Sequence, residues 1–159
     1  DIDAVKKVVF SFKGLEHRLE LVGEIDGVKY YNDSFSTNPQ TTLAAVKSFS
    51  EPITLILGGY DKGLDFGDMM QYLCAKINLK NIILIGDTEN KLYKLLNKFG
   101  CKKNIVRMSR AGMEIIVKRC KSLNEKGGIV LLSPACASFD MFSDYKDRGN
   151  QFKGIVAYG

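Results

Sequence analysis

The sequence alternates between short, fully apolar runs and longer segments whose apolar residues recur at helical spacing. The runs ITLILGG at 53–59 and NIILIG at 81–86 are apolar on both faces and end in glycine, which is typical of strands buried on both sides. The segment between them is apolar at every third or fourth position, at Phe66, Met69, Met70, Leu73, Cys74 and Ile77. Such spacing predicts an amphipathic helix. Strands that alternate with helices predict βαβ units and a mostly parallel sheet.

The remaining segments continue this alternation, apart from a hairpin near the start. Two strand-like segments are joined by Asp26-Gly27, a pair that favours a tight β-hairpin. The expected strands are 19–24, 28–31, 53–57, 82–85, 104–108 and 129–132. The expected helices are 3–12, 39–48, 66–77, 92–99, 110–122 and a last one that carries Phe152, Ile155 and Val156. The predicted fold is a Rossmann-like three-layer α/β sandwich, with an antiparallel strand added by the N-terminal hairpin.

Length and composition exclude several classes of protein. A chain of 159 residues suits a single domain, and no apolar run approaches the roughly 20 residues of a membrane span. The first residues lack the order of a signal peptide. The first residue is Asp1 rather than Met, so we expect a piece of a longer protein. The net charge of +5 comes from scattered lysines, which suits anionic ligands but not nucleic acid, because no basic and aromatic motif accompanies it.

The cysteines argue against a metal or redox motif. They lie far apart at Cys74, Cys101, Cys120 and Cys136, without a CxxC pair, and the single histidine is distant from all of them. That spacing excludes the common zinc and thioredoxin-like patterns. Three of the four stand in apolar surroundings, and we expect buried thiols in a reducing cytosol.

Polar residues collect directly after the predicted strands. Asn32-Asp33-Ser34, the loop GGYDKG, Gly86-Asp87 and the loop SPACAS each follow a strand, and ligands bind beyond the carboxyl ends of such strands. The antiparallel hairpin brings the start of its first strand beside the end of its second. One edge of the sheet is therefore expected to gather His17, Arg18, Asp33, Thr37, Lys62, Ser133 and Ser138.

Each of these residues also has an explanation without a ligand. Asn38-Pro39 has the form of an N-cap followed by proline at the first helical position. The glycines suit turns, and Lys62 suits a solvated turn. No GxGxxG, P-loop or GxSxG motif is present, so the sequence predicts an anion-binding edge without a complete catalytic site.

Four blocks of the sequence together resemble the C-terminal domain of the Mur ligases, and within that family the members that add D-glutamate. The blocks are GLEHRLELV, GVKYYNDSFSTNP, LILGGYDKGLDF and LLSPACASFDMFSDYKDRGNQF. The resemblance covers essentially the whole chain and is strongest at 14–39, 53–66 and 131–153. The related ligases for meso-diaminopimelate and L-alanine, and the folylpolyglutamate synthases, differ in these blocks.

The resemblance implies the third domain of a cytoplasmic, monomeric ligase of peptidoglycan synthesis, which serves cell wall biogenesis, cell shape and cell division. Residues 1–159 would form this domain, with 1–13 a lead-in helix from the missing central domain. The missing domains would hold UDP-N-acetylmuramoyl-L-alanine and the P-loop. ATP and Mg²⁺ would serve the full enzyme, neither being held tightly by this domain alone, which would be inactive by itself.

The resemblance also implies roles for single residues. His17, Arg18 and Asp33 would contact the nucleotide. Thr37 and Lys62 would bind the side-chain carboxylate of D-glutamate, and its α-carboxylate would meet Ser138 with backbone groups near Phe139 and Tyr145. The chain departs from the family at two positions. Phe35 stands where lysine is frequent, so any phosphate contact of that lysine is absent, and Tyr145 stands where phenylalanine is usual.

Two other functions remain compatible with the residues alone. A stand-alone regulatory module that senses an anionic metabolite would need the same anion-binding edge but no partner domains. The equivalent domain of a folylpolyglutamate synthase would share the fold and prefer L-glutamate. A coding sequence with a GxxxxGK[ST] motif upstream would favour a ligase, whereas a start codon beside Asp1 would favour the module.

Overall fold

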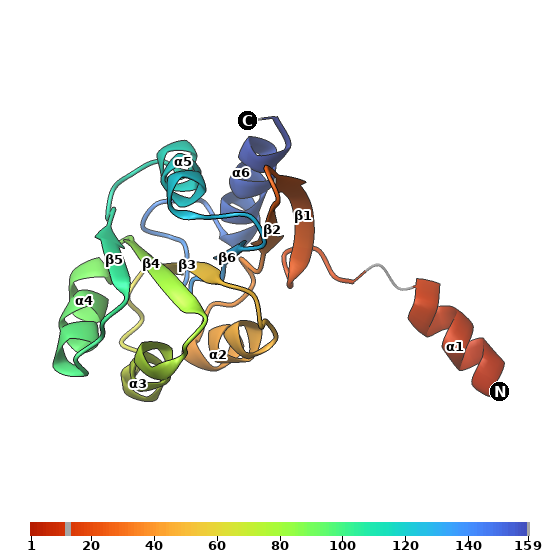
Figure 1. The fold of residues 1–159 in the computed structure, drawn as a ribbon, viewed down its shortest axis with the longest axis horizontal. Coiled ribbons are helices and arrows are strands. Elements are labelled where there is room, and N and C mark those ends of the chain that lie inside the picture. The colour runs from red at the N-terminus through yellow and green to blue at the C-terminus, as the bar shows by residue number, and fades with distance from the viewer. Residues whose placement is uncertain (12–13, 159) are drawn as a thin grey trace.

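A twisted six-stranded sheet forms the middle layer of the computed structural model, which describes residues 1–11 and 14–158 (Figure 1). The strand order is β1-β2-β6-β3-β4-β5. Only the β1–β2 pair is antiparallel, and the other pairs are parallel. The strands are β1 Glu20–Ile25, β2 Val28–Asn32, β3 Ile53–Gly58, β4 Leu79–Ile85, β5 Asn104–Arg107 and β6 Ile129–Leu132. The predicted fold class, including the antiparallel hairpin strand, is confirmed.

Helices cover both faces of this sheet (Figure 1). Three pack on one face, α2 Pro39–Lys47, α3 Gly67–Ala75 and α4 Glu89–Lys98, and two pack on the other, α5 Met113–Leu123 and α6 Tyr145–Tyr158. The chain passes from β3 to α3 on the first face and from β6 to α6 on the second. Neighbouring strands β3 and β6 therefore send their loops to opposite sides, and such a switch point opens a crevice for ligands.

The continuous apolar runs are buried because both faces of their strands are covered. Every residue of β3 and β6 is buried, and successive side chains of β3 enter different cores. Leu55 and Leu57 pack with α2, α3 and α4, whereas Ile56 packs with α5 and α6. This alternation follows from the two-residue period of a strand.

Several boundaries differ from the sequence prediction. Helix α5 begins at Met113 rather than at 110, because Gly112 has extended backbone and serves as its N-cap. Helix α3 ends at Ala75, which leaves Ile77 outside it and 83% exposed, so the predicted place of Ile77 in the apolar stripe was wrong. Asn38 caps α2 through a bond from the Thr41 amide, with Pro39 first in the helix, as predicted.

The first helix, α1 Ile2–Ser11, stands apart from the sheet (Figure 1). None of its residues is buried, and Ile2, Val5 and Val9 are exposed. Phe12, the last residue predicted for this helix, lies outside the described residues. None of the helices in the described part of the chain has the length and hydropathy needed to cross a membrane.

The four cysteines are free thiols, and two rather than three of them are buried. Cys120 and Cys136 lie in the cores, whereas Cys74 and Cys101 are only partly covered. Burial raises the pKa of the Cys120 thiol to about 12 and that of the Cys136 thiol to about 11. Thiols of that pKa are protonated and unreactive at neutral pH.

Candidate functional site

Asp33 joins the loops that follow β2 and β6 to the segment before β1. Its side chain is 2% exposed, and its carboxylate accepts hydrogen bonds from the Leu19 amide at 3.2 Å and the Ser133 hydroxyl at 2.7 Å. The Ser36 hydroxyl donates a third bond at 2.5 Å. Burial raises the pKa of Asp33, although these donors and the charge of Arg18 oppose the shift. Asp33 thus organises three segments of this edge through contacts within the protein.

His17 is held in one orientation and one tautomer. Its ring is buried, and the Asn32 side-chain amide donates to its Nδ1 over 2.9 Å. The oxygen of the Asn32 amide accepts from the Ser34 amide, which fixes the nitrogen toward the ring. A neutral imidazole that accepts at Nδ1 carries its proton on Nε2, and Nε2 lies 3.8 Å from Glu16 Oε1. His17 therefore offers an N–H donor on the side of Glu16.

Arg18 and Tyr145 line a hollow beside His17. The Arg18 guanidinium lies 4.8 Å from the centre of the Phe35 ring, which lies 4.9 Å from the Tyr145 ring. The hollow has a volume of about 340 Å³, and its lining is Leu15, Glu16, His17, Arg18, Phe35, Tyr145 and Lys146. Two cations, an imidazole and two aromatic rings suit the phosphates and the base of a nucleotide.

Arg148 fastens the loop after β2 to the loop after β6. It is fully buried, and its guanidinium donates to the Ser34 hydroxyl and carbonyl, both at 2.9 Å, and to the carbonyls of Cys136 and Ala137. Burial lowers its pKa to about 10, so the side chain stays charged at neutral pH. These acceptors are neutral, and the negative charge of Asp140 opposes the lowering of the Arg148 pKa.

The Lys62 side chain lies near Phe139, the residue that follows Ser138. The Lys62 ammonium lies 5.7 Å from the centre of the exposed Phe139 ring, and Phe139 directly follows Ser138. The Tyr60 amide donates to the Ala137 carbonyl at 2.9 Å, which aligns the GGYDKG loop with the SPACAS loop. Thr37 is half-buried, and its neighbour Ser36 accepts a bond from the Ala135 amide. Three of the five residues predicted for the glutamate side, Thr37, Lys62 and Ser138, thus stand on loops that bond to one another.

The sequence predictions missed residues that hold these loops. Arg148 belongs to the Arg-Gly-x-x-Phe block, but its neighbours in the chain, Asp147 and Gly149, give no sign that it is buried. Gly149 follows it, and a side chain there would collide with the His17 ring. No local signal marks Lys91, which reaches the GGYDKG loop from α4. Across the described residues, no group of three histidine, cysteine, aspartate or glutamate side chains is arranged to hold a metal ion.

Comparison with known families agrees with this fold. The family model described as "Mur ligase, glutamate ligase domain" matches residues 17–136. The chain belongs to the Mur ligase family. The structure is also similar to MurF from Acinetobacter baumannii, with a TM-score of 0.69 over 99% of this chain, 34% of that one and 12% identity. MurC from Thermotoga maritima matches over the same shares with a TM-score of 0.65 and 12% identity.

Curated relatives indicate which kind of Mur ligase the chain is similar to. It is 45% identical over 98% of its length to the UDP-N-acetylmuramoylalanine--D-glutamate ligase of Clostridium botulinum strain Langeland. It is 41% identical over 98% of its length to the enzyme of the same name from Caldanaerobacter subterraneus. In both cases the chain spans 34% of the relative, so this Mur ligase domain corresponds to about a third of those proteins.

Proposed function

We propose that this domain belongs to an ATP-dependent ligase that joins D-glutamate to UDP-N-acetylmuramoyl-L-alanine in peptidoglycan synthesis. The proposal rests on 45% identity to a ligase named for that reaction and on the meeting of the loops after β2, β3 and β6. The proposal includes a cytoplasmic location and a role in cell wall biogenesis, cell shape and cell division, all of which follow from the resemblance. The missing domains would hold the UDP sugar and most of the ATP site.

In the proposed reaction, ATP transfers its γ-phosphoryl group to the substrate carboxylate and leaves as ADP. The amine of D-glutamate then attacks the acyl carbon, and the tetrahedral intermediate collapses with loss of inorganic phosphate. This domain would contribute by holding the amine close to the acyl phosphate, because proximity replaces a bimolecular encounter. Its residues would bind and orient substrates and would not form a covalent intermediate.

D-glutamate would bind between the GGYDKG and SPACAS loops. A dianionic amino acid needs charge-assisted donors, which Lys62 supplies for the side-chain carboxylate and Thr37 supplements. The region of Ser138, Phe139 and Tyr145 would receive the α-carboxylate through backbone amides and a hydroxyl. The buried charge of Arg148 would favour the same anion from below.

The nucleotide would lie against the hollow beside His17. Arg18 would face a phosphate, and the Nε2 proton of His17 would be available to a ribose or phosphate oxygen. Asp33, with its carboxylate occupied by internal donors, would act mainly by fixing this edge. Mg²⁺ would be bound with ATP by the missing central domain rather than by a ligand set in this one.

The test is a ligation assay of the full-length gene product with its UDP sugar, ATP and D-glutamate. Replacement Lys62→Ala should weaken D-glutamate binding by roughly 1.5–3 kcal/mol, the scale of a hydrogen bond to a charged group, while the KM for ATP stays unchanged. Phosphate release that depends on D-glutamate but not on L-glutamate would support the proposal. Turnover of L-glutamate would contradict the proposal. An unchanged dissociation constant for D-glutamate in Lys62→Ala would also contradict it.

A further inference from the structure

The base of the GGYDKG loop is tied firmly to the start of α4. The Gly59 amide donates to the Thr88 hydroxyl at 3.0 Å, and the Thr88 amide donates back to the Gly59 carbonyl at 3.0 Å. Thr88 is fully buried. These two bonds fix the loop at residue 59. Lys62 lies three residues further on, in residues 61–64, which we call the crest of the loop.

A single lysine of α4 holds the crest of the loop. Lys91 Nζ lies 3.1 Å from each carboxylate oxygen of Asp61 and 3.2 Å from the Leu64 carbonyl oxygen. An ammonium group has three protons to donate, so this loop accounts for the full donor capacity of Lys91. The same ammonium lies 5.2 Å from the centre of the buried Phe66 ring.

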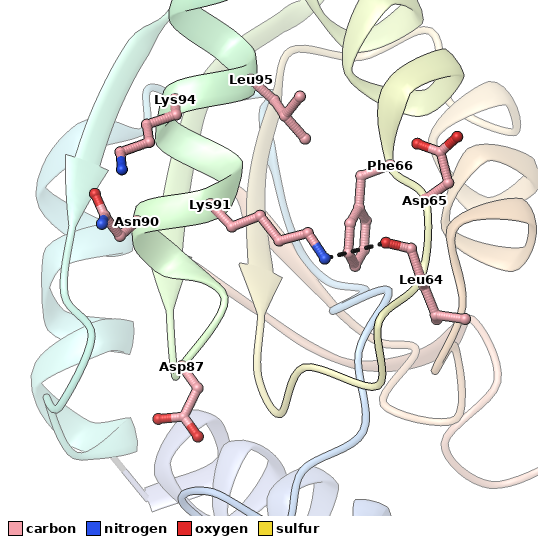
Figure 2. Close-up of a pocket in the computed structure, with 8 residues that line it drawn as sticks. All are labelled: Leu64, Asp65, Phe66, Asp87, Asn90, Lys91, Lys94 and Leu95. Atoms are coloured by element: carbon pink, nitrogen blue, oxygen red, sulfur yellow. Dashed lines mark hydrogen bonds between the residues drawn. The ribbon is translucent and has the colours of Figure 1, made fainter.

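The lysine reaches the loop across a hollow of about 560 Å³ between 64–66 and α4 (Figure 2). Figure 2 shows Lys91 pointing to Leu64 and Phe66, whereas Lys94, one turn away on the same helix, points away from them. Asp61 also accepts a bond from the Gly63 amide at 2.8 Å. Asp61 and Gly63 flank Lys62, so the contacts of Lys91 surround the residue that carries the proposed glutamate contact.

We propose that Lys91 is a positioning residue, which holds the 61–64 crest so that Lys62 faces Phe139 and a carboxylate of the substrate. The inference rests on the proposed function of Lys62. Without the contacts of Lys91, the crest would have only the turn at Asp61 and the glycine at 63, whose φ is +73°. Binding an anion would then include ordering the crest, and that ordering opposes binding.

The test uses steady-state kinetics of the full-length gene product with Lys91→Met, Asp61→Ala and the double variant. Each single variant should raise the KM for D-glutamate about threefold to tenfold, the range expected for a half-exposed ionic contact with added hydrogen bonds. The KM for ATP should not change. The effect of the double variant should be smaller than the product of the two single effects, because both changes break the Lys91–Asp61 contact and each removes only one further bond of its own. Lys94→Met is the matched control, with an expected change below about twofold.

Two outcomes would overturn the inference. If Lys91 acted only as a positive charge near an anionic substrate, Asp61→Ala would remove a negative charge and lower the KM for D-glutamate. If the two residues acted independently, their effects would multiply in the double variant. Lys62→Ala distinguishes the positioning role of Lys91 from the glutamate contact of Lys62. A large effect of Lys62→Ala with none from Lys91→Met rejects the positioning role alone. No effect of Lys62→Ala rejects the proposed glutamate contact itself.

Discussion

At the scale of single residues, backbone strain gathers where the loops meet. Among the described residues, four other than glycine have a positive φ, namely His17, Leu19, Asp26 and Ala135. Asp26 belongs to the hairpin turn, but the other three border the candidate site. Such conformations cost about 1–3 kcal/mol each and persist only where surrounding contacts enforce them. The bonds of Asn32 to His17, of Asp33 to Leu19 and of Ser36 to Ala135 supply that enforcement.

Arg148 is expected to be the most sensitive polar residue of this edge. Arg148→Lys keeps the charge but loses the planar fork, which leaves buried acceptors of Ser34, Cys136 and Ala137 without donors. The expected loss is roughly 2–4 kcal/mol in the free energy of unfolding, measured by urea denaturation. Arg110→Lys serves as the control, since Arg110 is largely exposed beside Asp87 and should change stability by less than about 0.5 kcal/mol. Equal effects of the two variants would contradict this account.

Gly86 lies where three loops touch, and it should not tolerate a side chain. A Cβ there would overlap the Asp140 carboxylate and the backbone of Gly59, whereas a Cβ at Gly100 would meet open space. Both glycines have similar positive φ values, +69° and +64°, so alanine carries similar backbone strain of about 1–2 kcal/mol at each. Thermal or urea unfolding should show Gly86→Ala to be more destabilising than Gly100→Ala by at least about 2 kcal/mol. Similar losses would mean that the loops separate easily.

At the scale of secondary-structure elements, one lysine of α6 adds ion pairs to the apolar packing between α6 and the hairpin. Lys153 Nζ lies 2.8 Å from Glu16 Oε1 and 2.8 Å from Glu20 Oε1. Glu20 also accepts bonds from the His17 amide and the Asn32 side chain. Burial by itself raises the pKa of Glu20, but these donors outweigh it and hold that pKa below its ordinary value.

This attachment predicts a pH dependence of stability. A carboxyl whose pKa is lower in the folded than in the unfolded state stabilises the fold above the unfolded pKa, and this contribution is lost as pH falls through the folded pKa. The free energy of unfolding of the unaltered protein should therefore fall more steeply than that of Glu20→Gln between about pH 5 and pH 3. Asp33 acts with the opposite sign because its pKa is raised, but it is present in both proteins. Parallel curves would show that Glu20 does not contribute.

At the scale of the whole molecule, α1 is an appendage rather than part of the fold. Its apolar residues are exposed and none is buried. The sequence prediction is that 1–13 leads in from a preceding domain. No observation of this chain tests that domain assignment, which stays a prediction. Residues 20–158 contain the whole sheet and both cores.

Removal of residues 1–13 should leave the stability of the domain almost unchanged. Because α1 buries no side chain, its loss forfeits little apolar area, and the expected change in the free energy of unfolding is below about 0.5 kcal/mol. The measurement is urea denaturation of 1–159 and 14–159 under the same conditions. A loss above about 1 kcal/mol would mean that α1 packs on the domain in solution.

The sequence by itself determined the order of strands and helices and the edge of the sheet at which polar residues collect. Apolar periodicity is a local property of the chain, so it identified β3, β4, β6 and the helices between them, and the Asn38-Pro39 cap fixed the start of α2. The same local signal misplaced the start of α5 and the end of α3. Apolar periodicity does not show that α5 begins only after its N-cap Gly112. It also does not show that Ile77 is exposed beyond the end of α3.

Only the tertiary structure decided which polar residues hold the site and which remain open to a ligand. Asp33 is turned inward onto Ser133, which is 100 residues away in the chain, and Arg148 bonds to Ser34 across 114 residues. Lys91 meets Asp61 across 30 residues. Such pairs form because buried or half-buried polar groups need partners once the strands align. Their identity depends on the packing of distant elements, and it leaves no pattern in the neighbouring sequence.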